Sequence, residues 1–315
     1  MTAFDVSVIG FYVLDILGRP VTAIPPGGRA YFIDEIAMTV AGTAGGTAVA
    51  CAILGLGTQA VGSVGDDELG DIMLGAMRRR GLDVGLVRRI AGVPTSATIL
   101  PVRPNGERPA LHVPGSAAHF DVAAADVDDA LNARFVHIGG TGLLRAFDGE
   151  PTRRMFRRAR ELGRITTFDL LQATPKTFAL VEPLLPYIDY FIPSLEEAAE
   201  MAGRSDPGEV SRFYLDRGVA TCVLTMGGEG AFIADSMGHR LRIPAFQVPV
   251  SDTTGCGDAF TAGFIAGLHR GWDLEQCGRF ASATAAIVAT GLGSNANLKS
   301  FEDTLKAMDS LQPLS

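Results

Sequence analysis

Short apolar runs without polar alternation are the sequence feature that most limits how this chain can fold. They lie at 5–10, 135–140, 165–171, 187–192 and 220–227. A strand buried on both faces carries apolar side chains at odd and even positions, which is typical of parallel sheets covered by helices. Segments with helical periodicity lie between the runs, at about 44–57, 67–80, 151–162, 195–202 and 207–217. The alternation predicts an α/β fold with a mostly parallel sheet.

One region interrupts this alternation. Residues 95–115 place an Asn-Gly pair at 105–106 between two extended runs, which is a strong hairpin signal. Pro101 and two further prolines argue against a central position for these strands in a sheet. Together with 31–40 and part of 11–24, the hairpin is expected to form a small antiparallel sheet that projects from the body. Such a sheet could cover a site or be a surface decoration.

Composition limits the partners of the chain. Its formal net charge is -8 and no basic tail is present, so we expect no nucleic-acid partner. No apolar run is long enough to cross a membrane, and the four cysteines lack metal-ligand or disulfide spacing, so we expect a cytoplasmic protein without membrane association. No linker or repeat divides the sequence. We therefore expect one domain over 1–315, with lid segments at about 11–40 and 95–115.

The segment SDTTGCGDAFTAGF, residues 251–264, carries the strongest chemical signal. Gly255, Cys256 and Gly257 precede a predicted helix, so their backbone N–H groups would form an anion cradle at the positive end of the helix dipole. Asp258 follows in the first helical turn. It could merely complement the dipole, or it could take the proton of a hydroxyl that attacks a phosphoryl group held in the cradle.

Two other phosphate-binding patterns were considered. The dinucleotide pattern GxGxxG/A occurs at 55–60, after a helix-like segment, and at 291–296, too near the end of the sequence for a βαβ unit. Neither has the required context. A P-loop is excluded because the chain contains no Gly-Lys dipeptide.

The 252–264 segment closely resembles the C-terminal signature of the ribokinase-like (PfkB) carbohydrate kinases, usually DTTGAGDAFxxGF, with Cys256 in place of alanine. Further segments similar to this family follow its order, at 61–70, 193–203, 225–231 and 279–294. The resemblance implies a three-layer α/β/α core with a small antiparallel β lid. It also implies the use of ATP and Mg²⁺, with Asp258 as catalytic base and the amides of 255–257 as the anion hole.

The resemblance assigns further residues to the nucleotide and to metal ions. The family's Asn-x-x-Glu motif, which organises the magnesium water shell, reads Ser194 to Glu197 here, so the asparagine is replaced. The nucleotide side would be formed by Thr225, Gly227, Gly228, Gly230 and Ser282. A monovalent cation such as K⁺ would be held by Asp252, Thr254, Val288, Gly291 and Gly293. A turn-forming role is an equal alternative for Asp252.

The acceptor side departs from the family pattern. Asp15, read as an acid at the end of an apolar strand, matches the aspartate that holds substrate hydroxyls. In the segment corresponding to GGxxxNxA, Gly42 is retained but Gly46 stands where the asparagine would be. Phe11 and Tyr12 could stack on a ring or fill the junction between lid and body, and packing is the favoured interpretation.

The sequence therefore predicts an ATP- and magnesium-dependent kinase that phosphorylates a hydroxyl of a sugar or sugar-like molecule. A nucleoside kinase of the same fold, a catalytically silent sugar-sensing protein and a dinucleotide-dependent oxidoreductase stay open as alternatives. The unpaired edges of a lid sheet could also join two chains into a homodimer.

Overall fold

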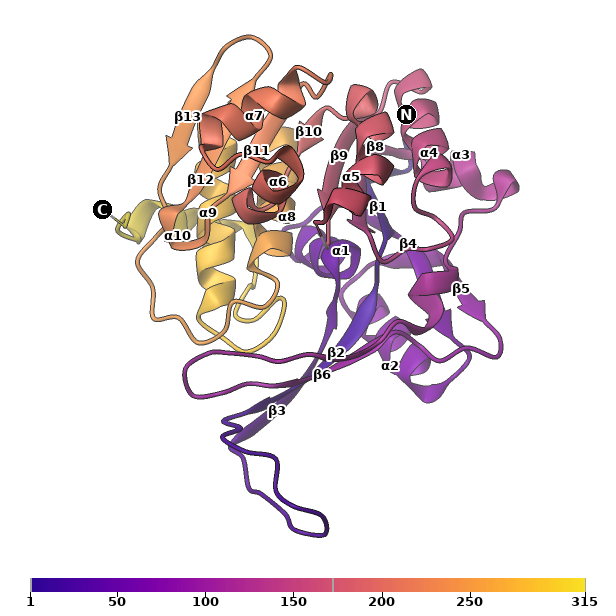
Figure 1. Ribbon diagram of the computed structural model, residues 1–315, viewed down its shortest axis with the longest axis vertical. Coiled ribbons are helices and arrows are strands. Elements are labelled where there is room, and N and C mark those ends of the chain that lie inside the picture. The colour runs from indigo at the N-terminus through magenta and orange to yellow at the C-terminus, as the bar shows by residue number, and fades with distance from the viewer. Residues whose placement is uncertain (1, 172, 315) are drawn as a thin grey trace.

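The computed structural model describes residues 2–171 and 173–314. Its centre is a nine-stranded sheet in the order β13-β12-β11-β10-β9-β8-β1-β4-β5, in which all pairs from β11 to β5 are parallel and β12 and β13 are antiparallel (Figure 1). The strands are β1 (Phe4–Gly10), β4 (Thr58–Gly65), β5 (Asp83–Ile90), β8 (Ala133–Thr141), β9 (Ile165–Leu170), β10 (Tyr190–Phe191), β11 (Thr221–Thr225), β12 (Ala231–Asp235) and β13 (Arg240–Ile243). The predicted parallel sheet is confirmed.

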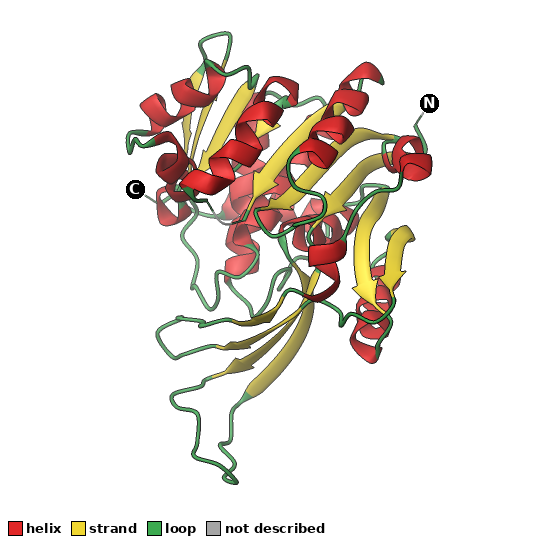
Figure 2. Cartoon of the chain, turned by 45° about the vertical axis from the view of Figure 1, so that its right-hand side comes forward, coloured by secondary structure: helices red, strands yellow, loops and turns green. Residues whose placement is uncertain are grey.

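Helices cover both faces of this sheet (Figure 2). One layer contains α1 (Thr43–Ile53), α2 (Glu68–Arg79), α8 (Cys256–His269), α9 (Leu274–Ala289) and α10 (Phe301–Ser310). The other contains α3 (Val127–Ala130), α4 (Glu150–Glu161), α5 (Pro175–Val181), α6 (Leu195–Ala202) and α7 (Pro207–Leu215). Successive residues of β1 point to opposite layers, since Val8 packs against the layer that contains α1 and Ile9 against the layer that contains α4. The three-layer α/β/α core is thereby confirmed.

A separate small sheet projects from this body (Figures 1 and 2). It has the order β3-β2-β6-β7 and consists of β2 (Val13–Arg19), β3 (Glu35–Ala41), β6 (Ala97–Pro101) and β7 (Leu111–Val113). The β2–β3 and β6–β7 pairs are antiparallel, whereas β2 and β6 run parallel. The expected exclusion of the 95–115 strands from a sheet interior was wrong for β6. Pro101 is its last residue, so the missing N–H removes no bond from the middle of the strand.

Several element boundaries differ from the sequence prediction. The helix expected at 44–57 ends at Ile53, because Gly55 turns the chain with a φ of 84°. The run at 187–192 gives only the two-residue β10, since a 3-10 helix occupies Glu182–Tyr187 before it. Strands β4 and β5 were not predicted. Within the described residues, no helix has the length and apolar character needed to cross a membrane.

Candidate active site

The N-terminus of α8 opens toward a pocket without a side-chain cap. Gly255 lies just before the helix with a φ of 74°, and a Cβ at this position would come 2.7 Å from the Cβ of Ser294, so only glycine fits. Gly257 borders open space. The amide of Cys256 makes one long bond, 3.3 Å, to the carbonyl of Thr253. The first turn of this 14-residue helix therefore offers N–H groups and the positive end of its dipole to an anion.

Asp258 lies in the first turn of α8, as predicted, and its half-buried carboxylate lines the pocket. Burial raises the pKa of this carboxyl to about 7, and the negative charges of Asp15 and Glu197 contribute to the rise. A carboxyl with this pKa can accept a proton near neutral pH.

Gly46 of α1 packs directly against the Asp258 side chain. A Cβ at position 46 would lie 2.9 Å from both the Cβ and the Cγ of Asp258, and closer still to its Oδ2. The carboxylate therefore occupies the space into which any side chain at position 46 would project.

The pocket in front of Asp258 is closed on one side by the small sheet. Asp15 points into it and is only 6% exposed. Its predicted place at the end of a strand was wrong: β1 ends at Gly10, and Asp15 lies inside β2 of the small sheet. Gly42 also lines the pocket, at the start of α1, where its φ of 86° and the nearby Phe11 carbonyl require glycine.

The two aromatics at 11 and 12 have different positions. Tyr12 is buried in the core and donates a hydrogen bond from its hydroxyl to the carbonyl of Val8 at 2.8 Å. Phe11 is 3% exposed, lines the pocket and contacts the ring of His112 edge to face. The favoured packing interpretation is confirmed for Tyr12, whereas Phe11 both packs and borders the pocket.

Ser194 and Glu197 form a capping box at the start of α6. The Ser194 hydroxyl donates to the Glu197 carboxylate at 2.6 Å and accepts from the Glu197 N–H at 3.2 Å. The second acid of this corner is Asp169, the penultimate residue of β9, which is 7% exposed. Burial and the charges of Glu197 and Asp258 hold the pKa of Asp169 well above its usual range. Asp169 and Glu197 both line this pocket, so their carboxylate oxygens could meet the water shell of a divalent cation.

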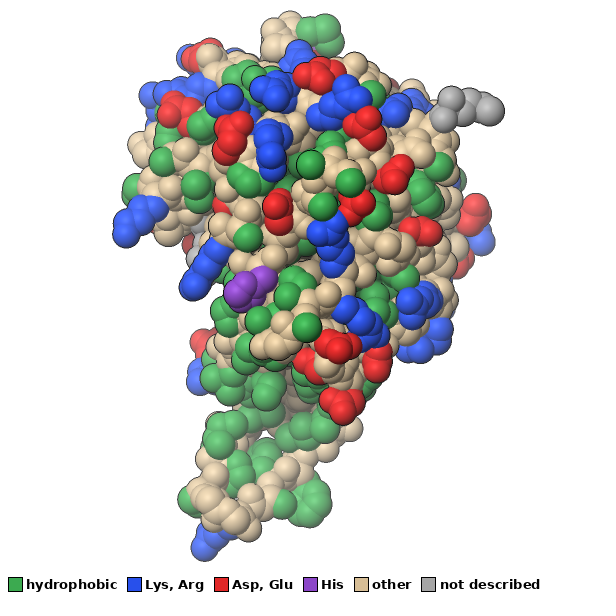
Figure 3. Space-filling model, turned by 90° about the vertical axis from the view of Figure 1, so that its right-hand side faces the viewer, with side chains coloured by type: hydrophobic (Ala, Val, Ile, Leu, Met, Phe, Trp, Pro, Cys, Tyr) green, Lys and Arg blue, Asp and Glu red, His purple; other side chains and the backbone are tan. Residues whose placement is uncertain are grey.

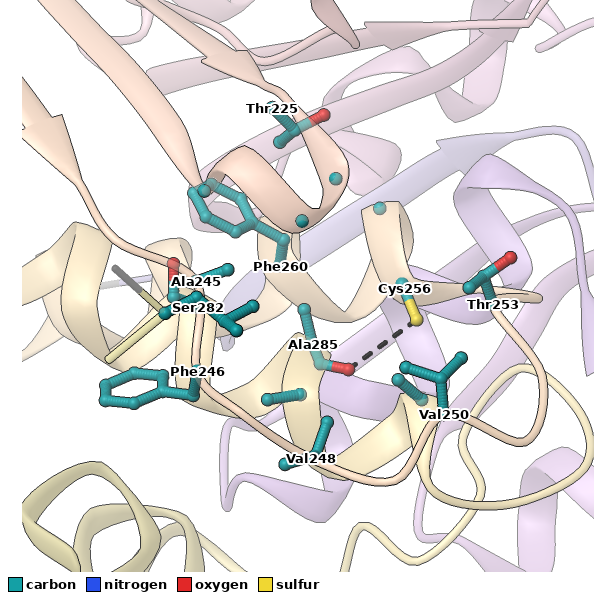
Figure 4. A pocket seen from close by; sticks show the side chains of 17 residues that line it. Thr225, Ala245, Phe246, Val248, Val250, Thr253, Cys256, Phe260, Ser282 and Ala285 are labelled. Atoms are coloured by element: carbon teal, nitrogen blue, oxygen red, sulfur yellow. Dashed lines mark hydrogen bonds between the residues drawn. The ribbon is translucent and has the colours of Figure 1, made fainter. Parts of the chain in front are cut away.

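A second, more apolar pocket adjoins the first, and the two share Thr225, Thr253 and Gly257. Figure 4 shows its walls, with Phe260 from α8 and Ser282 and Ala285 from α9 facing the segment that carries Ala245 to Val250. Five of the six residues predicted to bind the cofactor line this pocket, namely Thr225, Gly227, Gly228, Gly230 and Ser282, whereas Ser194 lines the first pocket. A Cβ at Gly227 or Gly228 would meet no atom, so this edge is open.

Cys256 lies between the two glycines of the anion loop and lines the apolar pocket. Its sulfur is 3.6 Å from the carbonyl oxygen of Ala285. Burial raises the pKa of the thiol to about 12, which keeps it protonated and unsuited to act as a nucleophile.

The residues predicted for a monovalent cation lie near one another behind the anion loop. The Asp252 carboxylate accepts bonds from the N–H and hydroxyl of Thr254, at 2.9 and 2.7 Å, and from the N–H of Gly293 at 2.9 Å. The Val288 carbonyl accepts the N–H of Gly291 at 3.2 Å. Asp252 thus has the turn-forming role that was the alternative to cation binding. Among the described residues, no group of three or more acidic, histidine or cysteine side chains is arranged to hold a metal.

Three ionisable residues of the pocket were not predicted from the sequence: Asp169, Arg108 and His112. Asp169 had a usable signal, because it lies near the end of an apolar run and the carboxyl ends of parallel strands meet at one edge of a sheet. Arg108 and His112 had none. They reach the pocket only because the hairpin folds back over the carboxyl edge of the large sheet.

The fold is that of the ribokinase-like kinases: a solved structure of Arabidopsis thaliana ribokinase complexed with ribose and ATP matches with a TM-score of 0.81 and 22% identity, covering 97% of this chain and 99% of that one. A putative ribokinase II from E. coli in complex with ATP and Mg²⁺ matches with a TM-score of 0.84, 18% identity and the same coverages of 97% and 99%.

The chain belongs to the pfkB family of carbohydrate kinases, whose family model matches residues 15–300. The 2-dehydro-3-deoxygluconokinase of Thermoproteus tenax is 30% identical over 311 residues, which is 93% of this chain and 94% of that protein. The family expected from the 252–264 signature and the expected enzyme class are confirmed.

Proposed function

We propose that this protein is an ATP- and magnesium-dependent kinase that phosphorylates a hydroxyl of a sugar or sugar-like molecule. One observation carries the proposal. Asp258 and the uncapped start of α8 lie where a polar pocket and an apolar pocket meet, with Gly257 lining both. A hydroxyl in the polar pocket and a phosphate chain extending from the apolar pocket would converge on this point.

Asp258 would accept the proton of the attacking hydroxyl. The N–H groups of Gly255, Cys256 and Gly257 would hold the γ-phosphoryl group and stabilise the charge that develops on it. ATP supplies the phosphoryl group when bound, and the side chains of the pocket position the hydroxyl and exclude water.

The apolar pocket fits the base and ribose of the nucleotide. Its walls are mostly apolar, and Gly227 and Gly228 leave its edge open, while Thr225 and Ser282 supply hydroxyl groups. Glu197 would hold Mg²⁺ through water, with Asp169 as the neighbouring acid. Ser194 supports Glu197 through the capping box in place of the amide of the family motif.

For K⁺, we propose a site at Asp252 and Thr254, together with the carbonyl groups of Val288, Gly291 and Gly293. The Asp252 carboxylate already accepts three bonds there. A rate that is equal in K⁺ and Na⁺ buffers would contradict this part of the proposal.

The polar pocket in front of Asp258, called the acceptor pocket from this point, suits a polyhydroxy compound. Asp15 can accept two O–H bonds. In the described part of the chain, the buried hydroxyls of Thr43 and Ser294 have no partner, and both residues line this pocket. The ring of Phe11 on the same wall favours a nucleoside as the second candidate acceptor.

Asp258→Asn tests the assignment of the base. We expect turnover to fall by about two to four orders of magnitude, while ATP binding measured by calorimetry stays near that of the wild type. A variant with wild-type turnover would overturn the assignment.

The acceptor itself is found by measuring ATP consumption with aldoses, ketoses, sugar acids, sugar phosphates and nucleosides. If none of these acceptors supported ATP consumption, the catalytically silent sugar-sensing alternative would be favoured.

We further propose a homodimer formed through the lid, in the cytoplasm. The outer face of the small sheet carries a row of paired residues, Ile16, Met38, Ile99 and Leu111, of which the last three are 58%, 54% and 63% exposed. Figure 3 shows hydrophobic side chains gathered on this projection. An apolar face is self-complementary under a two-fold axis. Ile99→Asp is expected to give monomers in analytical ultracentrifugation.

The proposed cytoplasmic location is supported by the four free cysteines, which fit a reducing compartment.

A further inference from the structure

A segment far from the signature motifs supplies part of the apolar pocket. After α10 the chain turns back, and residues 312–314, called the tail here, form an antiparallel bridge with residues 245–247. The N–H of Gln247 donates to the carbonyl of Gln312 at 2.8 Å, and the N–H of Leu314 donates to the carbonyl of Ala245 at 2.7 Å. The side chain of Leu314 lines the same pocket as Ser282 and Phe260.

The tail also holds the opposite strand of the bridge in place. Residues 245–250 belong to no helix or strand, yet Ala245, Phe246, Val248 and Val250 all line the pocket. In the part of the chain that the structure describes, the two bonds to the tail are the backbone hydrogen bonds that residues 245–250 make. Phe246 is 3% exposed and packs on Ala283 and Ala286 of α9, with Leu311 beside it. The wall is therefore fixed by α9 on one side and the tail on the other.

The chemistry of this pocket makes its shape important. Its lining contains no charged side chain, and most of its members are apolar. A flat heterocyclic base would be held there chiefly by contact area and close packing, which depend on the position of each wall. Leu314 is 42% exposed, so a base that contacts it would cover apolar surface now open to water.

We propose that the tail is a wall of the nucleotide pocket and that Leu314 contributes to nucleotide affinity, both by touching the base and by holding Phe246 and Val248 in place. This inference rests on the proposed function, because it takes the apolar pocket to be the nucleotide site. It assigns the tail no part in acceptor binding, since Leu314 does not line the acceptor pocket.

The test measures ATP binding by calorimetry in the absence of acceptor, together with the KM for the acceptor. We compare Leu314→Ala, Leu314→Asp and a chain lacking residues 312–315. Met237→Ala serves as the control, because Met237 is 79% exposed in the turn between β12 and β13 and lines neither pocket. We expect Leu314→Ala to raise the Kd for ATP several-fold, and Leu314→Asp and the shortened chain to raise it at least tenfold. The acceptor KM should stay within twofold of the wild type.

Hydrogen exchange gives a second readout that does not depend on turnover. Amide protection at Gln247 should fall in the shortened chain, while α8 keeps its protection, which also shows that the variant is folded. ATP binding equal to that of the wild type in all three variants would overturn the inference while leaving the kinase proposal intact. A wild-type protein that does not bind ATP would overturn both.

Discussion

At the level of single residues, the site is defined by carboxyl groups that oppose one another's ionisation. Asp258 has a pKa raised to about 7 by burial and by the charges of Asp15 and Glu197, and Asp169 is raised by burial, Glu197 and Asp258. A proton acceptor of this kind loses its function when it is protonated. The rate of a reaction that needs ionised Asp258 therefore depends on pH in the neutral range.

The first prediction concerns this pH dependence. We expect kcat/KM to fall by about tenfold per pH unit as the pH drops below about 7. Glu197→Gln removes one of the opposing charges and should move the acidic limb of the profile to lower pH, whereas Glu196→Gln, on the exposed side of α6, should leave it in place. An acidic limb near the ordinary aspartate pKa of 3.8 in the wild type would contradict the prediction.

The same raised pKa links Asp258 to stability. The folded protein keeps the proton of Asp258 to a higher pH than the unfolded chain does. The contribution of Asp258 to the free energy of unfolding is therefore fully present below pH 3.8 and is lost as the pH rises to about 7. The side chain of Asp258→Asn cannot ionise, so the variant does not lose this stability at high pH. At pH 8 the inactive variant should therefore melt at a higher temperature than the wild type.

The second prediction concerns Gly46. Gly46→Ala places a methyl group in the space of the Asp258 carboxylate, so the carboxylate must move. We expect kcat to fall at least tenfold, because small misplacements of a reacting group are costly. Gly45→Ala is a neighbouring control, since its Cβ would lie 3.2 Å from the Tyr12 ring and not at the base. Equal effects of the two variants on kcat would show that Gly46 has no special relation to Asp258.

At the level of elements, helix starts are used in two ways in this protein. Six of the ten α-helices in the described residues begin with a side-chain cap, such as Ser194 at α6 and Asp206 at α7. Helix α8 begins with none, and its N–H groups face the pocket. Capping satisfies donors within the fold, whereas the uncapped start leaves them for a ligand.

The third prediction compares two caps. Ser194→Ala and Asp206→Ala each remove a side-chain cap, so each should lower the free energy of unfolding by about 1 kcal/mol in denaturant titrations. Only Ser194→Ala also removes a hydroxyl that donates to the Glu197 carboxylate, which lines the polar pocket. We expect this variant to need a higher Mg²⁺ concentration for half-maximal rate, with no such change for Asp206→Ala. An unchanged magnesium requirement in both variants would separate Ser194 from the metal site.

At the level of the whole molecule, the small sheet and the body meet at the anion loop. Arg108, in the connection between β6 and β7, donates to the Thr253 hydroxyl at 2.6 Å and lies 3.5 Å from the Asp252 carboxylate. Arg108 is also a lining residue of the polar pocket in front of Asp258. A single side chain thus joins the projecting sheet, this pocket and the loop that begins α8.

The fourth prediction follows from this contact. Arg108→Ala should raise the acceptor KM and lower kcat, together by at least tenfold in kcat/KM, because the small sheet would be held less firmly over the pocket. Arg103→Ala is the matched control, since Arg103 lies in the same connection but pairs with the exposed Glu107 at 2.6 Å. Comparable kinetics for the two variants would show that the contact with Thr253 does not matter for turnover.

The parallel character of the large sheet, the hairpin and the family could be predicted from the sequence, because apolar periodicity, an Asn-Gly turn and a long glycine signature are local patterns. The three helix and sheet layers followed only from the family resemblance, and strands β4 and β5 were not predicted. The position of Asp258 in the first turn of α8 was predictable from the same local patterns. The interior place of β6 was not, because the effect of Pro101 depends on where the strand ends and which strands pair beside it.

Only the tertiary structure decided which distant residues share a pocket. Asp169 reaches Asp258 because parallel strands end at one edge of the sheet, Arg108 reaches Thr253 because the hairpin folds over that edge, and Leu314 reaches the apolar pocket through a bridge to residues 245–247. The raised pKa of Asp258 likewise depends on burial and on charges brought from other segments. Local patterns report what a backbone segment can form, whereas contact, burial and ionisation depend on how segments pack together in space.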